Sequence, residues 1–291
     1  MMWFLMLFNG IITSLATIIV ASMFGTNHEN LWSYGGFLAG IVISFTIAKF
    51  IVSKGGNKVL GFIAPARKMS NREQERVKHI LHGVQEATKQ NKNFSIEDIR
   101  LYTMDSPLLN AFAMGRNVLG ITIGALENLN DEELAGLIAH EFGHFFYKDS
   151  EKQAINFGLL CFAEAILWVN GLLLALRHLI SSSSSKNADD SPMGMAFIII
   201  LPILMFAFMF KFMGSIGIWV YNIVYRFRSH KLEYRADLFA CEIGFGAGLL
   251  SVLEKINSYE FKDNGFASRI KQTHPDTPLR IDEIDKYLAA I

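Results

Sequence analysis

Two histidines and a glutamate lie close together at His140–His144, where the order is His-Glu-Phe-Gly-His. If this segment is helical, His140 and His144 project from one face and their ring nitrogens can converge on a single Zn²⁺ ion. Glu141 then lies beside the first histidine, where it can take a proton from a water molecule that the metal activates. The residue types and spacing therefore indicate a zinc hydrolase site. Three fixed residues also arise by chance, so the surrounding elements have to support this interpretation.

The residues around this motif predict a helix from about Asp131 to Tyr147. Asn130 followed by Glu133 resembles a capping box, and the acidic first turn suits the positive end of the helix dipole. Gly143 is unusual, because a glycine costs a helix interior up to about 1 kcal/mol relative to alanine. Either the substrate or another chain segment comes close to the helix there, or the glycine is neutral.

A catalytic zinc site has three protein ligands and leaves its fourth position for water. Glu233 is the best candidate for the third ligand, and it lies in a second helical pattern that begins at His230. Asp237 follows on the same face, where it can accept a hydrogen bond from a liganding histidine and fix its tautomer. Taken alone, the two carboxylates are better explained as a solvated face that pairs with Arg235 or Lys231. Together with the histidine pair, the explanation as a metal ligand and its partner becomes the stronger one.

Together the motifs resemble those of the gluzincin membrane peptidases, which include the HtpX-type quality-control proteases and the CaaX prenyl-peptide proteases. The resemblance rests on His140–His144, on Glu233–Asp237 (Glu-Tyr-Arg-Ala-Asp), on Asn110–Ala113 (Asn-Ala-Phe-Ala) and on Thr273–Pro275, which Arg280 follows. It covers nearly the whole chain. It implies a zinc endopeptidase that degrades misfolded or damaged membrane proteins, often under stress.

The resemblance also implies roles for residues other than the metal ligands. One segment would form a sheet edge along the active-site cleft and pair with an extended substrate. The residues of this segment are Asn110, Ala111, Phe112 and Ala113. His274 is the candidate that stabilises the oxyanion, with Tyr234 and His230 as alternatives, and Arg280 would order that region through a carboxylate. Without the resemblance, Asn110 and His274 are also explained as turn residues.

The composition is that of a membrane protein, because 51% of the residues are hydrophobic and the mean hydropathy is +0.29. Four stretches reach the length of about 20 residues that a membrane helix needs. They run from about Trp3 to Phe24, from Leu31 to Val52, from Ile155 to Leu176 and from Met195 to Val220. The first stretch lacks the basic region of a signal peptide, so we expect it to be retained.

Basic residues follow the second and fourth stretches, so the positive-inside rule predicts that both termini and both polar segments face the cytoplasm. The chain then divides into a transmembrane hairpin (1–52), a first catalytic segment (53–154), a second hairpin (155–224) and a second catalytic segment (225–291). This topology brings His140, His144 and Glu233 to the same side of the membrane. In a prokaryote, the protein would be a multi-pass protein of the cytoplasmic (inner) membrane.

The polar segment before the metal motif shows the pattern of a compact unit. Ser70 and Glu73 predict another capping box, before an amphipathic helix. Leu109–Met114 and Val118–Ile123 flank a short turn and predict a β-hairpin. We therefore expect a mainly α-helical membrane protein with about four transmembrane helices. Its gluzincin-type catalytic domain would contain a small antiparallel β-sheet.

The function predicted from these observations is that of a membrane-integral zinc endopeptidase with one Zn²⁺ per chain. Its expected partners are unfolded or misfolded membrane-protein substrates and the lipid bilayer. Two alternatives stay open: a CaaX-type processing peptidase, which normally has more membrane spans, and a catalytically silent membrane scaffold or chaperone. The 27 basic residues balance the 27 acidic residues, and no extended basic patch occurs, so nucleic-acid binding has no support.

Overall fold

The computed structural model describes residues 2–24, 29–63, 66–183, 230–260 and 277–290. The chain separates into two compact units. One unit is formed by Met1–Phe50 with Ile155–Ile223, and the other by Ile51–Ala154 with Val224–Ile291. Each unit therefore consists of two stretches that are far apart in the sequence, and the chain passes from one unit to the other three times.

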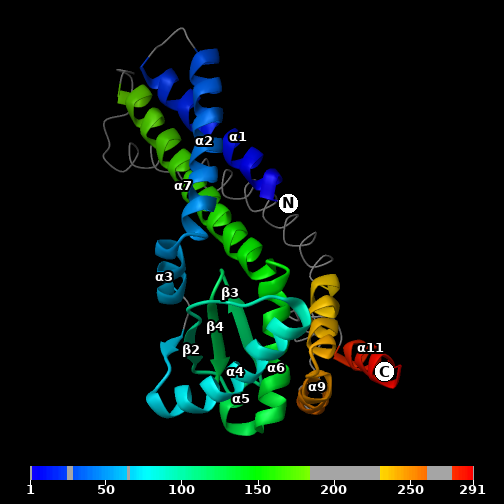
Figure 1. Cartoon of the computed structure of the whole chain (residues 1–291). Coiled ribbons are helices and arrows are strands. Elements are labelled where there is room, and N and C mark those ends of the chain that lie inside the picture. The colour runs from blue at the N-terminus through cyan, green and yellow to red at the C-terminus, as the bar shows by residue number, and fades with distance from the viewer. Residues whose placement is uncertain (1, 25–28, 64–65, 184–229, 261–276, 291) are drawn as a thin grey trace. The chain divides into compact units, whose positions relative to one another are not determined.

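Long apolar helices build the first unit (Figure 1). They are α1 (Met2–Met23), α2 (Glu29–Ile51) and α7 (Asp149–Ser183), of which α7 begins in the other unit. Within the described residues, three segments are long and apolar enough to cross a membrane: Met2–Met23, Asn30–Ile51 and Asp149–Leu174. They confirm the first three predicted spans, and the fourth predicted span (Met195–Val220) lies outside the described residues.

Small and polar side chains join the helices of the first unit. Gly40 of α2 lies so close to α1 that an added Cβ would be 2.7 Å from the carbonyl oxygen of Asn9. The buried Asn9 side chain donates hydrogen bonds to Ser44 Oγ on α2 (3.0 Å) and to the Leu159 carbonyl oxygen on α7 (3.3 Å). Close backbone approach and shared hydrogen bonds are what hold helices together in lipid, where burying apolar side chains adds little.

The second unit contains a four-stranded sheet in the order β1-β2-β4-β3. Its strands are β1 (Arg67–Lys68), β2 (Arg100–Met104), β3 (Ala111–Met114) and β4 (Val118–Thr122). β3 and β4 form the predicted antiparallel hairpin, in which Met114 lies opposite Val118. β2 and β4, however, run parallel to each other. The prediction of a wholly antiparallel sheet is therefore wrong, and the sheet is mixed.

The burial of β4 explains this arrangement. Every residue of β4 is buried, on both faces of the sheet. A strand of this kind takes a central position, where neighbours on both sides satisfy its backbone groups. The chain leaves β2, forms β3 first and returns as β4 between them, so that β4 runs in the direction of β2. β3 is left at the edge of the sheet.

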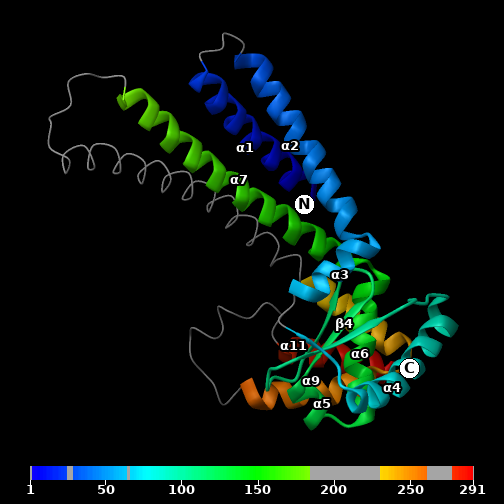
Figure 2. The same ribbon diagram turned by 90° about the vertical axis from the view of Figure 1, so that its left-hand side faces the viewer.

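Helices complete the second unit, as Figures 1 and 2 show. They are α3 (Lys54–Ile63), α4 (Asn71–Lys92), α5 (Ile123–Asn128), α6 (Asp131–Phe146), residues 230–242, α9 (Gly246–Glu260) and α11 (Thr277–Ala289). α6 contacts α4, β3 and α9, and α9 contacts α11. Both capping boxes predicted from the sequence are present, at Ser70 before α4 and at Asn130 before α6. α6 thus lies at the centre of the unit, with every residue from Glu133 to Phe145 buried.

Candidate active site

The start of α6 is fixed by charged and polar contacts. The side chain of Asn130 accepts a hydrogen bond from the Glu133 N–H, and the Glu133 carboxylate accepts one from the Asn130 N–H, both at 2.9 Å. Ser251 and Lys255 of α9 donate to the same carboxylate at 2.7 and 2.6 Å. Burial raises the pKa of Glu133, but the hydrogen bonds from Lys255 and the other donors outweigh this effect, so the pKa lies below its usual value. These contacts hold the helix that carries the histidine pair.

Helix 230–242 presents Glu233 to both histidines of α6. His140 Nε2 is 3.5 Å from one carboxylate oxygen of Glu233, and His144 Nε2 is 3.6 Å from the other. One ligand atom from each of the three residues lies within 4.8 Å of the other two, and all three side chains are buried. Among the described residues, this is the group that could hold a metal ion.

The donor set and its spacing fit zinc. Two imidazoles and one carboxylate form the ligand set of many catalytic zinc sites. Ligand atoms about 2.0–2.2 Å from one tetrahedral ion are separated from each other by about 3.3–3.5 Å. Each imidazole nitrogen lies about this far from a different carboxylate oxygen of Glu233, at 3.5 and 3.6 Å, and one ligand atom from each of the three residues lies within 4.8 Å of the other two.

Gly143 lies where the two ligand-bearing helices cross. A Cβ added at Gly143 would be 2.9 Å from the Cα of Ala236 and 3.2 Å from its Cβ. These distances are shorter than ordinary carbon–carbon contacts of about 3.5–4.0 Å. Another segment of the chain therefore comes close to the helix at Gly143, which was one of the explanations that the sequence left open.

Asp237 and Arg280 lie behind His140. The Asp237 carboxylate is 2.8 Å from His140 Nδ1, and Arg280 of α11 donates to both of its oxygens at 2.8 and 2.6 Å. Burial raises the pKa of Asp237, but Arg280 and His140 lower it to below its usual value. Burial lowers the pKa of His140, but Asp237 and then Glu233 raise it to about 10. A carboxylate at Nδ1 orients the ring and makes Nε2 a more basic metal ligand.

Glu141 lies between His140 and the sheet edge. Its Oε2 atom accepts a hydrogen bond of 2.6 Å from the backbone N–H of Ala113 in β3. Ala111 lies on the same strand, and its N–H donates to the side chain of Asn110 at 2.9 Å. The structure therefore brings the predicted edge segment, Asn110–Ala113, into direct contact with the glutamate of the motif.

Asp149 and Arg235, to which the sequence assigned no role at the metal, also lie at this site. Asp149 is 1% exposed, and its Oδ2 atom is 4.0 Å from His144 Nδ1 and 2.6 Å from the guanidinium of Arg235. The Arg235 guanidinium lies over the ring of Tyr147, 3.9 Å from its centroid. In the sequence, Asp149 follows Lys148 and resembles an ordinary charged residue at the start of an apolar helix. Only the chain's folding places it beside a histidine.

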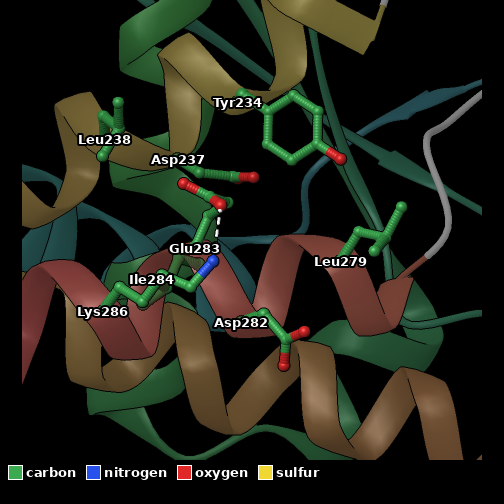
Figure 3. Close-up of a pocket in the computed structure, with 8 residues that line it drawn as sticks. All are labelled: Tyr234, Asp237, Leu238, Leu279, Asp282, Glu283, Ile284 and Lys286. Carbon is green, nitrogen blue, oxygen red and sulfur yellow. Dashed lines mark hydrogen bonds and ion pairs between the residues drawn. The ribbon is translucent and has the colours of Figure 1, made fainter.

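The remaining predicted residue, His274, lies outside the described residues, and so does the Thr273–Pro275 motif. A hollow of about 290 Å³ lies between helix 230–242 and α11 (Figure 3). Its lining residues are Tyr234, Asp237, Leu238, Leu279, Asp282, Glu283, Ile284 and Lys286. None of the three candidate metal ligands lines this hollow, which shares Asp237 with the site and is also lined by Tyr234, an alternative candidate for stabilising the oxyanion.

Comparisons with known proteins agree with this geometry. The sequence model of peptidase family M48 matches residues 71–288, a span that contains His140, His144 and Glu233. A protein named Protease HtpX homolog from Bacteroides fragilis (strain YCH46) is 28% identical over 228 residues, which are 76% of this chain and 63% of that protein. The protein of the same name from Tropheryma whipplei (strain Twist) is 26% identical over 278 residues, which are 84% and 87% of the two chains.

The crystal structure of S. mikatae Ste24p shares the fold, with a TM-score of 0.51 and 16% sequence identity. That match covers 94% of this chain and 62% of the Ste24p chain. This chain thus spans less than two-thirds of the length of the Bacteroides fragilis relative and of the solved structure. At this level of identity, the likeness to Ste24p concerns the fold.

Proposed function

This chain belongs to peptidase family M48, and we propose that it is a zinc-dependent endopeptidase that acts in a membrane. One observation carries the proposal. The ligand atoms of His140, His144 and Glu233 lie within 4.8 Å of one another. The two histidines and Glu141 belong to α6, and Glu233 belongs to helix 230–242, which crosses α6. Two imidazoles, one carboxylate and an adjacent carboxylate that is not a ligand are the groups that metal-assisted peptide hydrolysis requires.

A zinc ion held by His140, His144 and Glu233 would supply the Lewis acidity that activates water and polarises a peptide carbonyl. Glu141 accepts the proton of the attacking water and returns it to the leaving amine. Its contact with the Ala113 N–H keeps the carboxylate at the sheet edge, where a peptide can reach it. His274 is proposed to stabilise the oxyanion, as the family resemblance implies.

The substrate would bind along β3. This strand lies at the edge of the sheet, and the Ala113 N–H donates to Glu141 and not to β4. An extended peptide that adds to this edge therefore passes the Glu141 carboxylate. Pairing through backbone hydrogen bonds accepts many sequences, which suits unfolded or misfolded segments of membrane proteins. The apolar helices and the positive-inside rule favour cleavage at the cytoplasmic face, in a role of membrane-protein quality control and stress response.

The test is the cleavage of an unfolded membrane protein by the full chain purified in detergent. We expect the parent protein to cleave, a chelator to abolish cleavage, and added Zn²⁺ to restore it. Glu141→Gln should keep zinc binding and lose at least a hundredfold in rate, because general acid–base catalysis of this kind contributes about 10²–10⁴-fold. Glu132→Gln is the matched control, since Glu132 is exposed in the first turn of the same helix.

Equal cleavage by the parent and Glu141→Gln would refute the proposed mechanism, because Glu141 would then take no part in the cleavage. Absence of cleavage by a parent protein that binds zinc would instead favour a silent scaffold. Release of only a C-terminal tripeptide from prenylated peptides would favour a CaaX-type processing peptidase over a general endopeptidase.

A further inference from the structure

We propose that Asp149, held in place by Arg235, positions the imidazole of His144, as Asp237 held by Arg280 positions that of His140. Asp149 is thereby a positioning residue of the metal site, although it belongs to the first turn of a membrane helix. This inference rests on the proposed function, because it takes His144 to be a metal ligand.

The first argument is the state of His144 itself. Its Nε2 atom lies 3.6 Å from Glu233, on the side where the proposed metal would bind, and an imidazole that binds a metal through Nε2 carries its proton on Nδ1. Nδ1 is buried, and it has no hydrogen-bond partner in the part of the chain that the structure describes. Buried polar atoms are almost always paired, so this nitrogen requires an acceptor. The Asp149 carboxylate, 4.0 Å from Nδ1, is the acceptor that the geometry places on this side of the ring.

The second argument is the similarity between the two histidines. His140 Nδ1 contacts Asp237, and that carboxylate is bound by the guanidinium of Arg280 at 2.6 Å. On the other side of the site, Asp149 is bound by the guanidinium of Arg235, also at 2.6 Å. The carboxylates of Asp237 and Asp149 are 3% and 1% exposed, so neither is held in place by bulk water. Each histidine thus has a buried carboxylate and an arginine behind its Nδ1 atom.

The third argument is that the chain fixes Asp149 firmly. α6 ends at Phe146, Tyr147 caps it, Lys148 adopts a left-handed conformation (φ 57°) and Asp149 begins α7. Arg235, in contact with Asp149, also lies over the Tyr147 ring. A guanidinium that is stacked on a ring and bound to a carboxylate has little freedom to move. Asp149 is therefore held in place beside His144.

A purely structural role for Asp149 makes a different prediction. An aspartate in the first turn of α7 also stabilises the helix dipole, and it would then affect folding without affecting the metal. Zinc affinity distinguishes the two roles. Loss of a carboxylate behind a liganding histidine typically weakens metal binding by about 10–100-fold.

The experiment measures the zinc dissociation constant of the full chain in detergent, by competition with a chromogenic chelator. Asp149→Ala should bind zinc about 10–100-fold more weakly than the parent, and Asp149→Asn, which keeps an acceptor oxygen, should lose less. Lys152→Ala is the matched control. Its ammonium lies 3.4 Å from Asp149 and is 64% exposed, so we expect a change of less than about twofold.

Melting curves of the chelated proteins show whether each variant folds, and the Co²⁺ absorption spectrum reports the geometry at the metal. An unchanged zinc constant and Co²⁺ spectrum in Asp149→Ala, with a lowered melting temperature, would overturn the proposal in favour of the structural role. A parent that binds zinc and cleaves no protein would refute the proposed function alone, because the zinc constants still decide the role of Asp149. A parent that binds no zinc would overturn both.

Discussion

Replacing Gly143 by alanine tests whether the crossing of two helices sets the metal geometry. The new Cβ would lie 2.9 Å from the Cα of Ala236. Carbon atoms prefer a separation of about 3.5–4.0 Å, so the helices have to move apart by about 0.6 Å or more. Gly143 immediately precedes His144, and Ala236 lies one helical turn after Glu233. The displacement therefore acts directly on the separation between the ligands.

The expected effects on stability and on metal binding differ in size. Overpacking of this kind costs about 1–3 kcal/mol, and the helix gains about 1 kcal/mol when alanine replaces glycine. Without metal, Gly143→Ala should thus be less stable by up to about 2 kcal/mol. Zinc sites tolerate shifts of only about 0.2 Å in ligand distance, so we expect zinc to bind at least about tenfold more weakly. Chelator competition and thermal melting with and without zinc measure the two quantities.

Gly83→Ala is the matched control for this experiment. Gly83 lies in α4, on an exposed face, and an added Cβ would meet nothing within 4 Å. It should therefore stabilise the protein by about 0.5–1 kcal/mol through helix propensity and leave zinc binding unchanged. If Gly143→Ala were stabilised as much as Gly83→Ala and bound zinc as tightly as the parent, the close helix crossing would not set the separation between the metal ligands.

Two further predictions concern charged residues at and away from the site. Arg280→Met should destabilise the protein by up to about 3–5 kcal/mol, because it removes the guanidinium from the buried Asp237 carboxylate and leaves His140 as its remaining partner; thermal melting of the zinc-free protein measures this loss. The Arg67 guanidinium and the N-terminal turn of α4 lower the pKa of Glu73 from 4.5 to about 2. This group therefore stabilises the protein above about pH 4.5, and the contribution is lost as the pH falls toward 2. Acid unfolding of Glu73→Gln, followed by circular dichroism, should show a weaker pH dependence across this interval.

The parts of the site that follow from local periodicity could be predicted from the sequence. His140 and His144 share a helix face because they are four residues apart, and Glu233 and Asp237 do so for the same reason. The capping box at Asn130 locates the start of α6, since a side chain and a backbone amide three residues apart satisfy each other. These features depend only on the geometry of one helix.

What the sequence could not predict are contacts between elements. The direction of β4 depends on its burial between two neighbours, which strand alternation does not reveal. Gly143 allows a close helix crossing, and this role depends on its contact with Ala236 of another helix. The position of Asp149 in the sequence does not indicate its role, because its partner Arg235 lies 86 residues further along the chain, in helix 230–242. Such contacts follow from tertiary packing, and no periodicity in a single sequence encodes them.

The order of the ligands along the chain has a consequence for how the site is held together. His140 and His144 precede the stretch Ile155–Ile223, which belongs to the other unit, and Glu233 follows it. The two ligand helices are therefore far apart in the sequence, and contacts of their own keep them together. The close packing at Gly143, the buried pair of Arg280 with Asp237 and the pair of Arg235 with Asp149 supply such contacts without a metal. A site assembled in this way is preorganised, so zinc binding does not have to supply the free energy of bringing its ligands together.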